Sequence, residues 1–230
     1  MNKSTIITLV NVGDKVYIRG KVGNIAFSSS TYTQFKMTGL ISARGNCNAI
    51  WSYTNLNANM AKTYRGYRMF RDCVSLTTAP ELPSPTLASY CYYQMFYNCT
   101  SLVTAPVLPA ITASSYSYYQ MFYNCTNLNY IKCLTTYFGV SSTTGWLYNV
   151  DSIGTFVKHA DAVNWESGTS GIPDTWIIEE CELKHHFMTF VAKEDNSTIG
   201  LVSNNTRFLK YSFDKIHFDN FTDTITLNKG

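Results

Sequence analysis

The chain has 230 residues, of which 45% are hydrophobic and only 14% are charged, and its formal net charge is +3. This hydrophobic share excludes a disordered chain, and a chain of this length can bury a sizeable core. Lysine and arginine form no basic run, which disfavours nucleic acid as a partner. No run approaches the roughly 18 apolar residues of a membrane span, so we expect no membrane insertion.

Residues 1–50 are predicted to be a β-rich N-terminal segment or cap. Val16 and Ile18 alternate with polar neighbours, as in a strand, and Gly13 and Gly20 mark turns. No secretory signal is evident, because the start has one lysine and then only a short apolar stretch broken by threonine and asparagine. If the protein acts outside a cell, we expect another segment or route to deliver it, as a virion does.

A repeat with a period of 26 residues follows within residues 51–180. Its copies begin at Met69, Met95 and Met121, with MFRDCVSLTTAPELP, MFYNCTSLVTAPVLP and MFYNCTNLNYIKCL. A fixed period of this length predicts stacked units that share one core. Equivalent side chains should then form columns, with Phe70, Phe96 and Phe122 in a single buried file.

One repeat is expected to combine a helix and a strand. The stretch 86–98 lacks proline and glycine and suits a short helix, whereas 101–105 suits one strand. Pro106 and Pro109 then force an extended return. Stacking such units predicts an α/β solenoid with a parallel ladder on one face and helices on the other.

The end of the solenoid is predicted to be a cap over residues 131–180. Its aromatic plug would contain Phe156, Trp165 and Trp176. Residues 181–230 read as short alternating strands, which predicts a partial β-sandwich-like segment. The stretch 225–227 repeats the letters of 7–9, which favours one unit, or a fragment, of a longer tandem array.

No residue pattern indicates catalysis or a metal site. Seven cysteines form no CxxC pair, and Cys73, Cys99 and Cys125 recur at one repeat position, so we expect them to be small buried residues. The sequence contains no GxSxG, P-loop or GxGxxG motif, and no paired carboxylates flank an obvious cleft. We therefore expect neither an enzyme nor a cofactor. The histidines are also expected to bind no metal: His159, His185, His186 and His217.

The repeat phrase MF-x-x-C-x-S-L-x-x-A-P-x-L-P, with CYYQ or SYYQ before the next MF, resembles the BspA-like class of leucine-rich repeats. The stretch GTFVKHADAVNWESGTSGIPDTW is similar to the terminal cap of such proteins in gut bacteria and their phages. The resemblance implies surface exposure and attachment to host proteins, glycans or cell envelopes, and it implies no catalytic residues.

Three functions are compatible with the sequence. The first is a recognition module on a phage tail or fibre that binds a bacterial envelope glycan or surface protein. The second is a fragment of a bacterial cell-surface adhesin, and the third is a structural spacer in a tandem array. A homo-oligomer or head-to-tail assembly is also possible. Candidate binding residues lie in repeated columns: Tyr92, Tyr97, Tyr118 and Tyr123 on the expected helix side, and Thr78, Thr104 and Tyr130 on the strand side.

Overall fold

The computed structural model divides the chain into two compact units, residues 1–182 and residues 183–230. Each unit is considered by itself. Within the first unit the structure describes residues 6–20, 27–51, 62–162 and 165–181. Within the second it describes residues 197–200, 210–211, 219–220 and 224–227.

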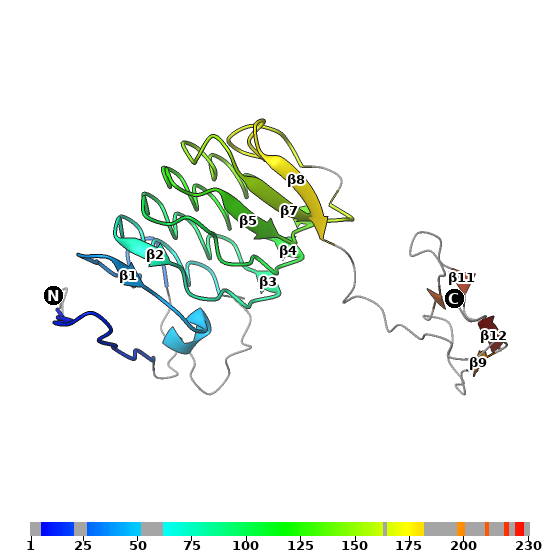
Figure 1. Ribbon diagram of the computed structural model, residues 1–230, viewed down its shortest axis with the longest axis horizontal. Helices are drawn as coiled ribbons and strands as arrows, with labels where there is room; N and C mark the ends of the chain where they lie inside the picture. The colour runs from blue at the N-terminus through cyan, green and yellow to red at the C-terminus, as the bar shows by residue number, and fades with distance from the viewer. Residues whose placement is uncertain are drawn as a thin grey trace. The chain divides into compact units, whose positions relative to one another are not determined.

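The first unit is a β-solenoid of about four turns with almost no helix (Figure 1). Its described part contains a single short 3₁₀ helix, η1 (Cys47–Ile50). The predicted solenoid with stacked repeats is therefore confirmed. The predicted α/β character is not, since the repeats carry no helical layer.

Two parallel ladders run along the solenoid, one on each of two sides of the coil. The first begins with β1 (Ile41–Ser42) beside β2 (Leu76–Thr78), continues through a bridge between Thr104 and Tyr130, and ends in a three-stranded sheet. The strands of that sheet are β5 (Tyr130–Cys133), β7 (Thr155–His159) and β8 (Ile177–Cys181). The second ladder consists of β3 (Thr86–Leu87), β4 (Thr112–Ala113) and β6 (Tyr137–Phe138).

The third side of each coil is a run of tight turns, and here the helix predicted over 86–98 is wrong. Every fourth residue has a positive φ, as at Tyr90 (61°), Gln94 (52°) and Asn98 (61°), which ends any right-handed helix. Alternate backbone N–H groups bond within the coil, whereas the others donate to the next coil. The Phe70 N–H donates to the Met95 carbonyl at 2.9 Å in this way.

The sequence resembles a helix here because its buried positions also recur every four residues. Cys91, Met95 and Cys99 are fully buried at this spacing. A helix repeats every 3.6 residues, so over nine residues its apolar face is nearly the same as that of a coil with a period of four. The two cannot be told apart from the apolar pattern alone.

The repeated columns pack as expected from the period. The ring centroids of Phe70 and Phe96 lie 5.4 Å apart, and those of Phe96 and Phe122 lie 5.6 Å apart, with all three side chains buried. The predicted single file is confirmed, and it begins one coil earlier at Phe35, which stacks on Phe70. The cysteine column is buried as predicted: Cys73, Cys99 and Cys125.

Aromatic side chains close the far end of the core. Trp165 stacks on Trp146 at 5.4 Å and packs edge-on against Phe156 at 4.9 Å. Trp176 is buried, and its indole N–H donates to the Asp151 carbonyl at 2.8 Å. These residues form the aromatic plug that the sequence suggested.

The described residues of the second unit form two antiparallel pairs. Strand β9 (Ser197–Gly200) pairs with β12 (Thr224–Leu227), and β10 (Lys210–Tyr211) pairs with β11 (Asp219–Asn220). The predicted sandwich-like segment remains a prediction, since most of its residues lie outside the described part. His185, His186 and His217 also lie outside it.

Candidate recognition surface

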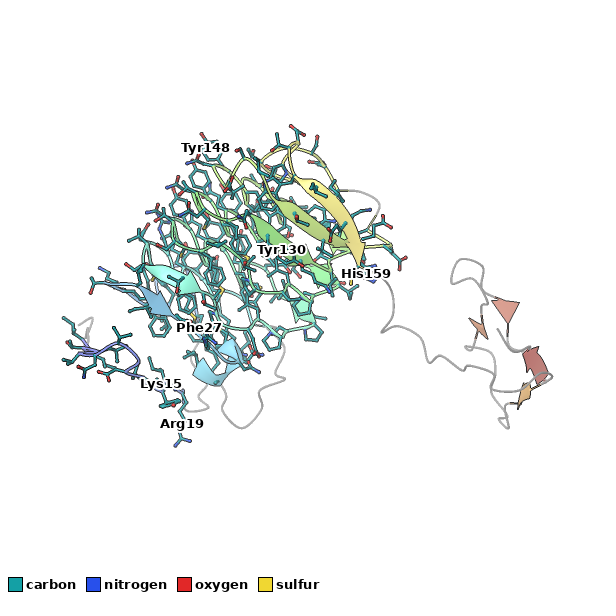
Figure 2. All side chains as sticks on the ribbon, in the orientation of Figure 1. Lys15, Arg19, Phe27, Tyr130, Tyr148 and His159 are labelled. Carbon is teal, nitrogen blue, oxygen red and sulfur yellow. The ribbon has the colours of Figure 1, made fainter. Side chains whose placement is uncertain are left out.

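The turn side of the solenoid carries a file of stacked tyrosines. The rings of Tyr97 and Tyr123 are 4.8 Å apart and parallel within 1°, and Tyr148 continues the file 4.6 Å from Tyr123. The guanidinium of Arg71 lies 4.4 Å from the ring centroid of Tyr97 and covers its other face. Tyr148 is 48% exposed and lies at the outer edge of the solenoid (Figure 2).

Beside this tyrosine file, side-chain amides form a second column. The Asn98 amide N–H donates to the Asp72 carboxylate at 3.2 Å, and the Asn124 amide donates to Asn98 Oδ1 at 2.7 Å. Asn149 donates to Asn124 Oδ1 at 2.6 Å. Each of these residues has a positive φ, which asparagine and aspartate tolerate better than most residues. We call the surface that they form with the tyrosine file the ladder face: Arg71, Asp72, Tyr97, Asn98, Tyr123, Asn124, Tyr148 and Asn149.

A third polar column lies next to the ladder face. The Gln94 amide donates to Gln120 Oε1 at 2.6 Å, and Gln94 Oε1 accepts from both Arg68 and Arg71. Gln94 is buried, so these bonds also satisfy polar atoms that water does not reach. The column holds the two arginine side chains in fixed positions at the start of the ladder face.

The structure corrects the placement of two predicted binding residues. Tyr92 and Tyr118 lie inside the coil, and both are almost fully buried. The Tyr118 hydroxyl is 3.4 Å from Thr135 Oγ1, and burial raises its pKa well above the ordinary value. Both rings pack in the core and do not lie beside Tyr97 on the surface, because two adjacent residues in every four of the turn segment are buried, as Cys91 and Tyr92 are.

The strand-side candidates form one exposed column. Thr104 pairs with Tyr130, and Tyr130 pairs with Thr155 in the neighbouring coil, with Thr78 one period before Thr104. Thr78, Thr104 and Tyr130 are all exposed. They share a face, as predicted, but that face is a different side of the coil from the ladder face.

Sequence reasoning missed Tyr148 and the whole asparagine column. Tyr148 follows Tyr123 by 25 residues and not 26, so a search at a constant period does not find it. A search that allows a deletion of one residue would have found both Tyr148 and Asn149. The recurrence of Asn98 and Asn124 at one repeat position was the available signal for a column.

Potential metal-ligating side chains do not cluster among the described residues. Within them, no group of three or more histidine, cysteine, aspartate or glutamate side chains could hold a metal ion. His159 is buried, and its Nδ1 accepts a backbone hydrogen bond from Asp161 at 3.1 Å. The described part also contains no helix with the length and hydropathy needed to cross a membrane.

Comparison with family models, with curated proteins and with solved structures gives no match. The resemblance to BspA-like repeats therefore remains a prediction from the repeat phrase.

Proposed function

We propose that the chain is a non-catalytic recognition module of a phage tail or fibre, and that its ladder face binds a bacterial envelope. The observation that supports this is the ordered, partly exposed file of Tyr97, Tyr123 and Tyr148 beside the asparagine column. Stacking between coils would stabilise a spacer as well, so what favours recognition is that the file leaves ring edges and hydroxyl groups partly open to solvent. Contiguous exposed aromatic surface is typical of binding sites.

The stacking limits the kind of partner. Neighbouring tyrosine rings cover each other's faces at 4.6 and 4.8 Å, so a sugar ring has no room to stack between them. The file instead offers ring edges and hydroxyl groups, and the asparagine column offers amide donors and acceptors at a similar spacing. Such a face suits an extended polymer rich in hydroxyl groups, so we favour an envelope glycan over a folded protein.

The hydroxyl group of Tyr123, in the middle of the file, can donate a hydrogen bond as well as accept one. Partial desolvation, and then the adjoining Tyr148 and Tyr97, raise the pKa of Tyr123 above its usual value. This hydroxyl therefore stays protonated throughout the neutral range and acts as both donor and acceptor.

The test replaces Tyr97, Tyr123 and Tyr148 together by phenylalanine. This variant keeps the stacked rings and removes only the three hydroxyl groups, so the fold should be retained. We expect binding to isolated bacterial envelopes to fall at least tenfold. The matched control is Tyr137→Phe, which changes a tyrosine that is 67% exposed on another side of the coil.

Unchanged binding of the triple variant, with the control also unchanged, would contradict recognition through the ladder face. Equal losses in both variants would show that tyrosine hydroxyls act nonspecifically. If the unmodified protein binds no envelope preparation, the spacer hypothesis takes precedence.

A further inference from the structure

Charge is distributed very unevenly along the solenoid. Residues 6–71 contain nine lysine or arginine residues and one acidic residue, Asp14. Between Asp72 and Lys132, Glu81 is the only lysine, arginine, aspartate or glutamate. Residues 133–181 contain one lysine and six acidic residues: Asp151, Asp161, Glu166, Asp174, Glu179 and Glu180. The stacked coils thus run from a basic end through a nearly uncharged middle to an acidic end.

The strand ladder is open at both of these ends. β1 has a partner only in β2, and β8 has a partner only in β7, within the part of the chain that the structure describes (Figure 1). Such edges present backbone N–H and carbonyl groups that can pair with another strand. Arg44 follows β1 closely, whereas Glu179 and Glu180 lie in β8.

The acidic end also exposes apolar side chains. Their equivalents in the preceding coils are covered by the next coil. Ile131, Phe156 and Ile178 are successive members of one inward-facing column. The first two are fully buried, but Ile178 is 53% exposed because no described coil follows it. Ile177, in the outward-facing column, is 64% exposed.

We propose that β8 of one molecule pairs in parallel with β1 of a second molecule, so that the solenoids join head to tail. Shifting a copy along the solenoid axis places its β1 after β8 in the same direction as every other strand of the ladder. Along this ladder the contact then reproduces the strand pairing between neighbouring coils, on a different side of the first coil from Ala49, to which the Gly20 N–H donates. It also brings the basic end of one copy to the acidic end of the next, which favours this encounter.

The same charges disfavour the symmetric alternative. A two-fold dimer that joined β8 to β8 would place Glu179 and Glu180 of both copies against each other, and like charges across paired strands are destabilising. A head-to-tail contact leaves one open end on each side, so further copies can add and form a filament. The proposal goes beyond the recognition function and does not depend on it.

The register of the contact follows from the outward-facing column. Ser42 pairs with Thr78, Tyr130 pairs with Thr155, and Thr155 pairs with Ile177. The next member after Ile177 is therefore Ser42 of the second copy. Equivalent residues of paired parallel strands lie close enough for a disulfide bond.

The first test is a cross-link between two full-length variants, Ile177→Cys and Ser42→Cys. We expect a mixture to form a disulfide dimer under mild oxidation, and each variant alone to form little more than the parent protein. Dimer formation by Ile177→Cys alone would indicate the two-fold contact and overturn the proposal. A mixture that forms no more dimer than the single variants would overturn it as well.

The second test measures self-association by sedimentation velocity at several salt concentrations. We expect association that weakens at least tenfold between 50 mM and 500 mM NaCl, and that Glu179→Lys abolishes. Glu81→Lys is the matched control, because it makes the same change outside β1 and β8, in the coil that pairs with the first one, and should leave association intact. A monomer at all concentrations and salt levels would overturn the proposal, as would equal effects of the two variants.

Discussion

Substitutions at Asn98 distinguish the left-handed turns from an α-helix. The turns predict that the alanine variant is less stable than the glycine variant, whereas a helix predicts the opposite order. Asn98 has a φ of 61°, and its amide side chain bonds to both Asp72 and Asn124. Replacing it by alanine or by glycine removes the same two hydrogen bonds. Alanine, however, keeps a Cβ atom that makes the left-handed conformation unfavourable, whereas glycine adopts it freely.

The magnitudes follow from these two contributions. Losing two partly exposed hydrogen bonds costs about 1 kcal/mol in total, and the left-handed strain of alanine adds about 1 kcal/mol more. We expect Asn98→Ala to lower the free energy of unfolding by about 2 kcal/mol, and Asn98→Gly to lower it by about 1 kcal/mol. In an α-helix the order is reversed, because glycine is about 1 kcal/mol less favourable than alanine.

The assay is urea unfolding, followed by tyrosine fluorescence and by circular dichroism, with the two probes required to agree. The control is the same pair of substitutions at Thr126, an exposed turn residue that is not among those with positive φ. There the alanine variant should be at least as stable as the glycine variant. If Asn98→Ala proves more stable than Asn98→Gly, the left-handed turn structure is refuted.

Four further predictions concern the column of turns, the plug, the thiols and the aromatic file. Gly145 has a φ of 61°, and a methyl group added there would meet only ordinary contacts. Because alanine is strained in this left-handed conformation, Gly145→Ala should lower the free energy of unfolding by about 1 kcal/mol in urea, whereas the same change in a helix would raise it. Gly154→Ala would place its Cβ 2.5 Å from the Trp176 ring and 2.6 Å from a backbone carbonyl, so it should lower the melting temperature and increase the exposure of tryptophan to iodide quenching. Burial raises the pKa of the Cys125 thiol to about 12 from an ordinary value of 9.0, so the folded state holds this proton and its contribution to stability should fall as pH rises above 9, by up to about 1.4 kcal/mol per pH unit. Other buried thiols, such as Cys47, behave in the same way, so Cys125→Ala should reduce the slope by the share of one thiol, and an identical slope in both proteins would count against the burial. Phe96→Ala empties the middle of the buried aromatic file and should cost about 3–5 kcal/mol, whereas a loss below about 1 kcal/mol would be inconsistent with a packed column.

The period and the aromatic plug could be predicted from the sequence, because both depend on which residues are apolar and how they recur. A spacing of 26 residues places Phe70, Phe96 and Phe122 in equivalent environments whatever the backbone does between them. The end of the core was the apolar surface available to the large aromatic side chains that follow the last repeat, so these side chains were expected to cover it. These inferences did not require knowledge of the backbone conformation.

The turn segment could not be predicted because its conformation depends on hydrogen bonds between coils. Half of its N–H groups donate to a neighbouring repeat, and this long-range contribution offsets the strain at positions such as Tyr90 and Gln94. Local propensity favoured a helix, and the apolar pattern was compatible with one. The same error placed Tyr92 and Tyr118 on the surface, since it assigned the wrong residues to the inward face.

The ladder face was predicted in part. Tyr97 and Tyr123 were identified from the period, and the structure stacks them. Tyr148 was missed because the last repeat is one residue shorter than the others. The asparagine column depends on side-chain bonds between coils, which a single repeat does not reveal.

Deleting one repeat is the most direct test of the claim that consecutive 26-residue units stack in register. Removing residues 90–115 joins Ser89 to Tyr116, so that Tyr116 takes the position of Tyr90 and every column continues. We expect this variant to keep a β-rich circular dichroism spectrum and cooperative unfolding, at reduced stability. Removing half a period, residues 90–102, should abolish both, and equal behaviour of the two deletions would contradict the stacked structure.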